Sequence, residues 1–137
     1  MTPVIEAEGL GMSFGGEEVL GEIYLSVGEG EIFGLIGPSG AGKSTLTRLL
    51  TGYLRPSRGS VRVFGRDPCA FGAADRRRIG FMPQGFVLYG GLSVRQNVNF
   101  AAGLYGLRLG ERRRRVREVL EFTELWKDRR KAASRLS

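Results

Sequence analysis

The apolar positions in the first half of the chain follow the spacing of strands. Residues 4–10 and 18–27 mix apolar and polar side chains with a period near two, which predicts two half-buried strands joined by the glycine-rich turn at 14–18. The next apolar run, IFGLIG at 32–37, is continuous and bounded by glycines, as is typical of a buried parallel strand. The stretch 43–52 then reads as a helix that Gly52 closes as a C-cap.

Two more strands are expected before the pattern changes. Val61 and Val63 alternate with polar residues in a short strand between two turns, and RRIGFMPQ at 77–84 reads as a strand that Pro83 ends. A β-rich part followed by a strand–loop–helix unit is therefore predicted for most of the first 92 residues.

From Ser93 onward the period becomes that of helices. Ser93 and Gln96 have the spacing of a capping box, which satisfies the first free amides of a helix. The apolar face of this helix is expected to consist of Val94, Val98, Ala101 and Tyr105. A second amphipathic helix is expected to place Val116, Val119, Leu120 and Thr123 on one side and arginines on the other.

Composition narrows the class of protein. No apolar run approaches the roughly 20 residues of a membrane span, so direct membrane insertion is not expected, and the start lacks the features of a signal peptide. The net charge of +7 arises entirely in residues 66–137, which carry +9, against −2 in residues 1–65. No aromatic residues interleave with the arginine clusters, so a solvated helix surface is favoured over a nucleic-acid groove.

The motif GPSGAGKS, from Gly37 to Ser44, matches the phosphate-binding pattern G-x-x-x-x-G-K-[S/T] at each fixed position. Glycines at 37, 40 and 42 let the backbone turn its amides inward around an anion, and the helix that follows presents free amides and a positive dipole end. Lys43 is expected to reach the β- and γ-phosphates, the Ser44 hydroxyl to ligate Mg²⁺, and Thr45 to bond an earlier phosphate. Chance matches in a glycine-rich chain are rare, and the expected strand before and helix after supply the required context.

Several motifs in order resemble the first part of the ATPase subunit of an ABC transporter. They are SFGGEEVLGEIYLSVGEGEIFGLIGPSGAGKSTL, LTGYLRPSRGSVRVFGRD and IGFMPQGFVLYGGLSVRQNV, which look like the opening strands with the Walker A loop, the connection after its helix, and the Q-loop region. The resemblance implies an α/β, RecA-like P-loop fold with an antiparallel β-subdomain (within 1–92) and the start of a helical subdomain (93–137). The stretch LSVRQNVNFAAGLYGL is similar to the exporter branch of the family.

The resemblance also implies roles for individual residues. Phe14 falls where the family stacks a ring on adenine, with an ordinary core residue of a strand as the alternative. Gln84 falls at the Q-loop glutamine, which would ligate Mg²⁺, orient the attacking water and report to the membrane partner. The ATP-binding set is completed by the phosphate loop: Gly37, Pro38, Ser39, Gly40, Ala41, Gly42, Lys43, Ser44 and Thr45.

The sequence ends at Leu136 and Ser137, two residues into a match to the family signature LSGGQ. No apolar run leading into an aspartate and no histidine occurs in the chain, so the resemblance implies the N-terminal part of an ATP-binding domain, expected to bind ATP and Mg²⁺ but not to hydrolyse ATP alone.

The implied function is an ATP-binding subunit that powers transport, favouring export. It would work with a transmembrane permease and a second ATP-binding subunit, as a peripheral protein at the cytoplasmic face of the membrane. A guanylate-kinase-like nucleotide kinase and a soluble ABC-type ATPase acting on nucleic acid or ribosomes are the alternatives.

Overall fold

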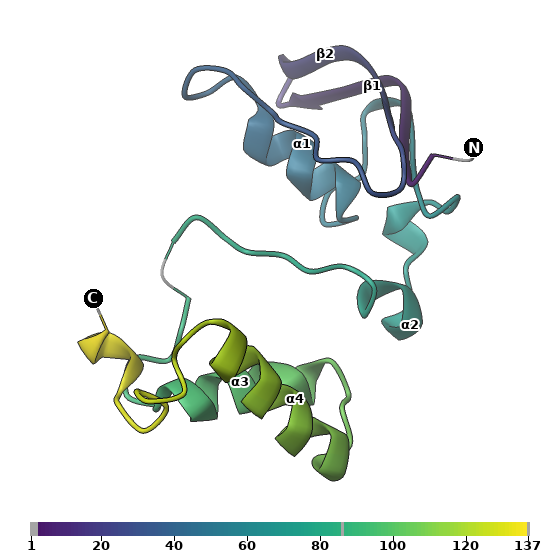
Figure 1. Ribbon diagram of the computed structural model, residues 1–137. Coiled ribbons are helices and arrows are strands. Elements are labelled where there is room, and N and C mark those ends of the chain that lie inside the picture. Colours follow the sequence, from purple (N-terminus) through teal and green to yellow (C-terminus); the bar gives the residue numbers. More distant parts are fainter. Residues whose placement is uncertain (1–2, 86, 137) are drawn as a thin grey trace. The chain divides into compact units, whose positions relative to one another are not determined.

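A computed structural model describes residues 3–85 and 87–136. The chain divides into two compact units, one from Met1 to Gly80 and one from Phe81 to Ser137, which are described separately below (Figure 1). None of the helices in the described residues has the length and apolar character required to cross a membrane.

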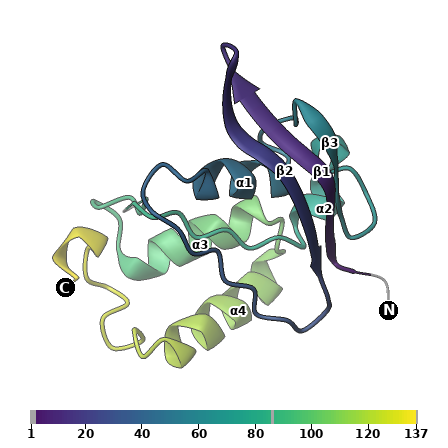
Figure 2. The same cartoon turned by 90° about the horizontal axis from the view of Figure 1, so that it is seen from above.

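A three-stranded antiparallel sheet organises the first unit. Its strands are β1 (Ile5–Phe14), β2 (Glu17–Val27) and β3 (Arg58–Val63), in the spatial order β2-β1-β3 (Figure 2). Ile5 of the central strand is paired with Val27 on one side and Val63 on the other, so the apolar positions of all three strands share a face. These strands and the turn at Gly15–Gly16 confirm the predictions for residues 4–27 and 61–63.

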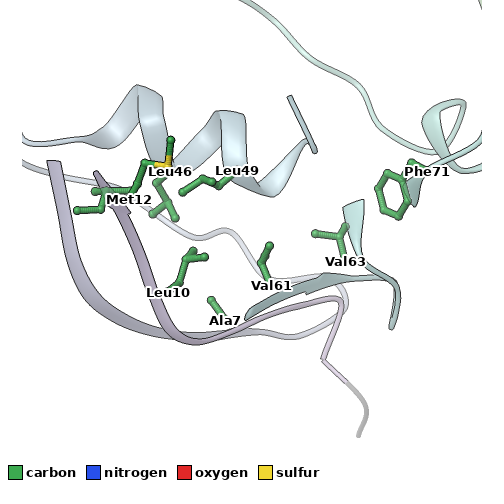
Figure 3. Packing of buried hydrophobic residues seen from close by; sticks show 9 residues of the cluster. Ala7, Leu10, Met12, Leu46, Leu49, Val61, Val63 and Phe71 are labelled. Carbon is green, nitrogen blue, oxygen red and sulfur yellow. The ribbon is translucent and has the colours of Figure 1, made fainter. Parts of the chain in front are cut away.

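Helix α1 (Lys43–Leu50) covers the apolar face of this sheet. Its Leu46 and Leu49 point toward Leu10 and Val61 of the strands (Figure 3). The C-cap of α1 is Thr51 rather than the predicted Gly52, and Gly52 follows it in the left-handed conformation, with φ of 71°. The core of the unit consists of Ala7, Leu10, Met12, Leu20, Leu46, Leu49, Val61, Val63 and Phe71.

Two of the predicted strands do not form: the buried parallel strand at IFGLIG and the strand at RRIGFMPQ. Residues 31–36 and 80–83 are extended but unpaired, and Ile32, Ile36 and Met82 expose 93% or more of their surface. A strand needs a neighbour for its amides and carbonyls, and every strand among the described residues belongs to the antiparallel sheet. The predictions of a buried strand at IFGLIG and of a strand at RRIGFMPQ are therefore wrong for this structure.

Two short helical elements follow β3, and the sequence pattern predicted neither of them. They are the 3₁₀ turn η1 (Pro68–Ala70) and helix α2 (Ala73–Arg76). The Asp67 carboxylate caps η1 by accepting a hydrogen bond of 2.8 Å from the Cys69 amide.

The second unit is built on two helices, α3 (Val94–Leu104) and α4 (Leu109–Phe122), followed by the 3₁₀ turn η2 (Ala133–Arg135). The predicted capping box is confirmed, because Ser93 Oγ accepts from the Gln96 amide and Gln96 Oε1 accepts from the Ser93 amide. The core of this unit consists of Val94, Val116 and Leu120, with Val98, Ala102, Leu125, Trp126 and Leu136 packed against it.

The helix faces differ in part from the predicted ones. In α3, Ala102 packs into the core while Ala101 and Tyr105 are exposed. In α4, Val119 and Thr123 are also exposed, although Val116 and Leu120 are buried as predicted. The cause is the narrow contact between only two helices, which buries a stripe of about one residue per turn rather than a wide face.

Candidate phosphate-binding loop

The predicted phosphate loop connects the exposed segment at 31–36 to the first turn of α1. It ends at Gly42, which is the N-cap of the helix and has φ of 81°. A Cβ atom on Gly42 would lie 2.3 Å from Cδ2 of Leu20 and 3.0 Å from the carbonyl oxygen of Val19. Strand β2 thus packs directly against the junction of loop and helix, and only glycine fits there.

The loop itself is a tight turn exposed to solvent. The Ala41 amide donates to the Pro38 carbonyl over 3.3 Å, and Gly40 has φ of 85°. Gly37 does not need a left-handed conformation; a Cβ atom there would lie 3.3 Å from Cβ of Ala41. Alternating left-handed glycines allow neighbouring amides to face one side, which is the backbone arrangement that binds anions.

Lys43 is folded across this turn. Its ammonium group donates hydrogen bonds of 2.6 Å to the carbonyl oxygens of Gly37 and of Pro38. The positive charge is therefore held at the loop, at the residue for which the sequence predicts phosphate contact. An anion entering the loop would meet a lysine that is already positioned.

The helix that follows offers free amides. The Leu46 amide donates to the Gly42 carbonyl over 2.8 Å and closes the first helical turn, so the amides of Lys43, Ser44 and Thr45 precede the intrahelical ladder. Helix dipole and amides together favour an anion at this end.

Ser44 is exposed on the same turn, and its hydroxyl makes no hydrogen bond within the described residues. A hydroxyl ligand combined with phosphate oxygens and water suits Mg²⁺, which rarely receives an all-protein cage. The residues at the loop therefore fit a Mg²⁺–nucleotide complex.

Phe14 lies at the last position of β1, where it pairs with Glu17 across the turn. Its ring is 46% exposed, so a planar group has access to it. Phe14 does not belong to the core cluster. The alternative, that Phe14 is an ordinary core residue of the strand, therefore does not hold for this structure.

Gln84 belongs to the second unit, whereas the phosphate loop and Phe14 belong to the first. It is exposed in a bend that directly follows Pro83. The structure thus leaves its side chain accessible, and its role toward Mg²⁺ and water stays a prediction.

Sequence reasoning missed the residue that fixes the segment after Gln84. Asn97 of α3 is 6% exposed; its Oδ1 accepts from the Tyr89 amide, and its Nδ2 donates to the carbonyls of Tyr89, Leu92 and Ser93. One buried amide therefore fastens the 89–93 segment to the helix. The only signal for this role in the sequence was a polar residue close to the predicted apolar face of the helix.

Comparison with known proteins agrees with these features. The family profile described as "ABC transporter" matches residues 20–137. The chain is 45% identical over 105 residues to the probable multidrug ABC transporter ATP-binding protein YbhF of Escherichia coli, covering 77% of this chain and 18% of that protein. It is 48% identical over 111 residues to the methionine import ATP-binding protein MetN of Caulobacter vibrioides, covering 78% and 33%.

Among solved structures, cbiO1 of Clostridium perfringens, described as part of the ABC transporter complex cbiONQ, matches with a TM-score of 0.86 and 28% identity. That match covers the whole of this chain and 57% of the other. The chain therefore spans a third or less of the two curated relatives and little more than half of the solved neighbour.

Proposed function

This chain belongs to the ABC transporter family, and from that premise we propose that it binds ATP within an ATP-binding subunit that powers transport. The fold is that of a partial P-loop ABC domain, with the antiparallel sheet and α1 in place. The observation that carries the proposal is Lys43, held by two carbonyl oxygens at a loop whose helix amides are free.

In the proposed complex the triphosphate lies in the loop. Amides from Gly40 to Thr45 donate to the phosphate oxygens, and the ammonium of Lys43 exchanges its carbonyl partners for the β- and γ-phosphates. The Ser44 hydroxyl would be the protein ligand for Mg²⁺, which would supply neutralisation of phosphate charge. Phe14 stacks on the adenine ring, and the role of Gln84 toward Mg²⁺ and the attacking water stays a prediction.

A series of nucleotides tests the phosphate part of this proposal. Calorimetric titration with ATP, ADP and AMP in the presence of Mg²⁺ should show tight binding only when the β-phosphate is present. Ser44→Ala should lose the Mg²⁺ dependence of ATP binding while keeping Mg²⁺-free binding. Equal affinity for AMP and ATP would argue against a site built on the phosphates.

We further infer that the chain has a transmembrane permease as partner, which would hold it at the cytoplasmic face of a membrane. A second ATP-binding subunit would bind on the other side of the nucleotide. Family membership supports this proposal and favours it over the kinase alternative. The similar relatives include both a probable multidrug protein and an importer, so they do not decide the direction of transport. Our proposal of export rests on residues 92–107 alone.

Co-expression tests the permease. The chain is expressed together with a candidate permease, chosen as a membrane-spanning protein whose gene adjoins that of the chain, and a tag on the candidate permease is used for purification in detergent. Co-purification that depends on both proteins supports the proposal. Its absence with and without ATP, for a chain shown to be folded, would contradict it.

A further inference from the structure

The outer edge of β3 is open beside Val61. The Phe64 amide donates to the Val4 carbonyl over 2.8 Å, toward β1, and the Val63 amide donates to the Arg66 carbonyl over 2.9 Å, on the opposite side. Successive amides of a strand point to opposite sides, so the Val61 amide points outward, as that of Val63 does. Within the described residues no acceptor lies on that side for Val61.

A pocket of about 610 Å³ lies along this edge. It is lined by the outer strand at 59–62 and by the segments before and after it, at 55–56, 65 and 67. The bridge between Val63 and Arg66 closes one end of the edge. What remains open is a short stretch of strand at the floor of a pocket, long enough to pair with a few residues of an extended chain.

The pocket carries unpaired positive charge. Of the arginines around β3, Arg58 pairs with Glu18, and Arg66 pairs with Asp75 at 2.8 Å. Arg55 and Arg62, which line the pocket, form no ion pair within residues 3–85 and 87–136.

Two carboxylates of this part of the chain, Asp67 and Glu6, form no ion pair with either arginine within the described residues. Asp67 accepts a hydrogen bond from the Cys69 amide at the start of η1. Glu6 faces Arg62 in the register of β1 and β3 but does not reach ion-pair distance within the described residues. Asp67 also lines the pocket, so the pocket offers two guanidinium groups against one carboxylate and keeps an excess of positive charge for an external acid.

We propose that this edge is a docking site for an extended acidic peptide segment of another protein. The peptide backbone pairs with the Val61 edge as an added strand, and its carboxylates bind Arg55 and Arg62. An edge amide combined with two separate arginines matches a peptide better than a small anion, which would occupy only part of the pocket. The site involves no residue of the phosphate loop, so it is independent of the proposed nucleotide binding.

Fluorescence anisotropy with a labelled synthetic peptide of alternating valine and glutamate tests the proposal on the full chain. A peptide with lysine in place of glutamate tests charge, and one with methylated backbone nitrogens tests strand pairing. The variant Arg55→Gln/Arg62→Gln is compared with Arg113→Gln/Arg130→Gln, which removes the same charge from exposed positions of the second unit. Circular dichroism checks that both variants fold, and ATP affinity should be equal in all.

Only the acidic peptide is expected to bind. The Arg55→Gln/Arg62→Gln pair should weaken its binding about tenfold, because two exposed ion pairs are lost together. The control pair should leave the binding unchanged. Equal weakening by the control pair would reduce the effect to net charge and overturn the proposal. So would undiminished binding of the methylated peptide, displacement by inorganic phosphate at equal concentration, or self-association of the chain abolished by Arg55→Gln/Arg62→Gln.

Discussion

Replacing Gly42 with alanine is expected to destabilise the first unit and to displace the phosphate loop. The residue has φ of 81°, and the added methyl group would lie 2.3 Å from Cδ2 of Leu20. The left-handed conformation costs alanine about 1–2 kcal/mol, and overpacking adds about 1–3 kcal/mol, so the free energy of unfolding should fall by about 2–5 kcal/mol. Urea denaturation followed by circular dichroism measures the stability loss, and titration with ATP measures the loss of binding.

Two other glycines separate the contributions. Gly30 has φ of 78° with open space around the position of a Cβ atom, so Gly30→Ala should show only the conformational cost. Gly80 has neither a left-handed backbone nor a neighbour within 4 Å. Gly80→Ala should therefore change the free energy of unfolding by less than about 0.5 kcal/mol.

A double-mutant cycle with Leu20 isolates the steric part. Leu20→Ala removes the side chain that the new methyl group would strike, at a cost of its own of about 2–5 kcal/mol. In that background Gly42→Ala should cost less than in the wild type, because the conformational share of about 1–2 kcal/mol remains together with only the contact of 3.0 Å to the Val19 carbonyl oxygen. The reasoning is refuted if Gly42→Ala costs no more than Gly80→Ala, or if its cost is the same with and without Leu20.

Three further predictions concern other residues. Asn97→Ala should lower the free energy of unfolding by about 1–3 kcal/mol in urea denaturation, because it leaves the Tyr89 amide without its acceptor and removes the donor that the carbonyls of Tyr89, Leu92 and Ser93 share; an unchanged midpoint would contradict this. Burial, followed by the charge of Asp67, raises the pKa of the Cys69 thiol, so the thiol stays protonated at neutral pH. Iodoacetamide should therefore react slowly with Cys69 at neutral pH and faster only at alkaline pH. Asp67→Asn should shift that reactivity profile to lower pH, and an identical profile would rule out the charge. Phe14→Ala should weaken ATP binding about tenfold in calorimetry without affecting tripolyphosphate; equal loss for both ligands would remove the adenine contact.

Local patterns of the sequence were enough to predict the hairpin of β1 and β2, strand β3, helix α1 and the capping box at Ser93. For the hairpin, α1 and the capping box, the partner that completes the element is near in sequence or belongs to the same helix, whereas β3 pairs with β1, which is distant in sequence. IFGLIG and RRIGFMPQ gave the same kind of signal, but among the described residues neither segment joins a sheet. Periodicity indicates that a segment suits a strand and says nothing of whether a partner is present.

The candidate site was predictable as far as its motif reached. GPSGAGKS identifies the loop, and the structure adds that Lys43 already bonds to the Gly37 and Pro38 carbonyls. The contact of Leu20 with Gly42 is a tertiary one between segments 22 residues apart in the printed sequence. The fastening of residues 89–93 by Asn97 depends in the same way on how a loop folds back on a helix, which no spacing rule encodes.

The most direct test of the account is the affinity for ATP of the Lys43→Ala variant. Isothermal titration in the presence of Mg²⁺ is carried out on the wild-type chain, on Lys43→Ala and on Lys127→Ala, which removes an equal charge from an exposed position of the second unit. Loss of charge-assisted hydrogen bonds of about 1.5–3 kcal/mol predicts that Lys43→Ala binds ATP about 10 to 100 times more weakly, while Lys127→Ala binds as the wild type does. Unchanged affinity in Lys43→Ala, or no ATP binding by the folded wild-type chain, would contradict the assignment of this loop as a nucleotide site.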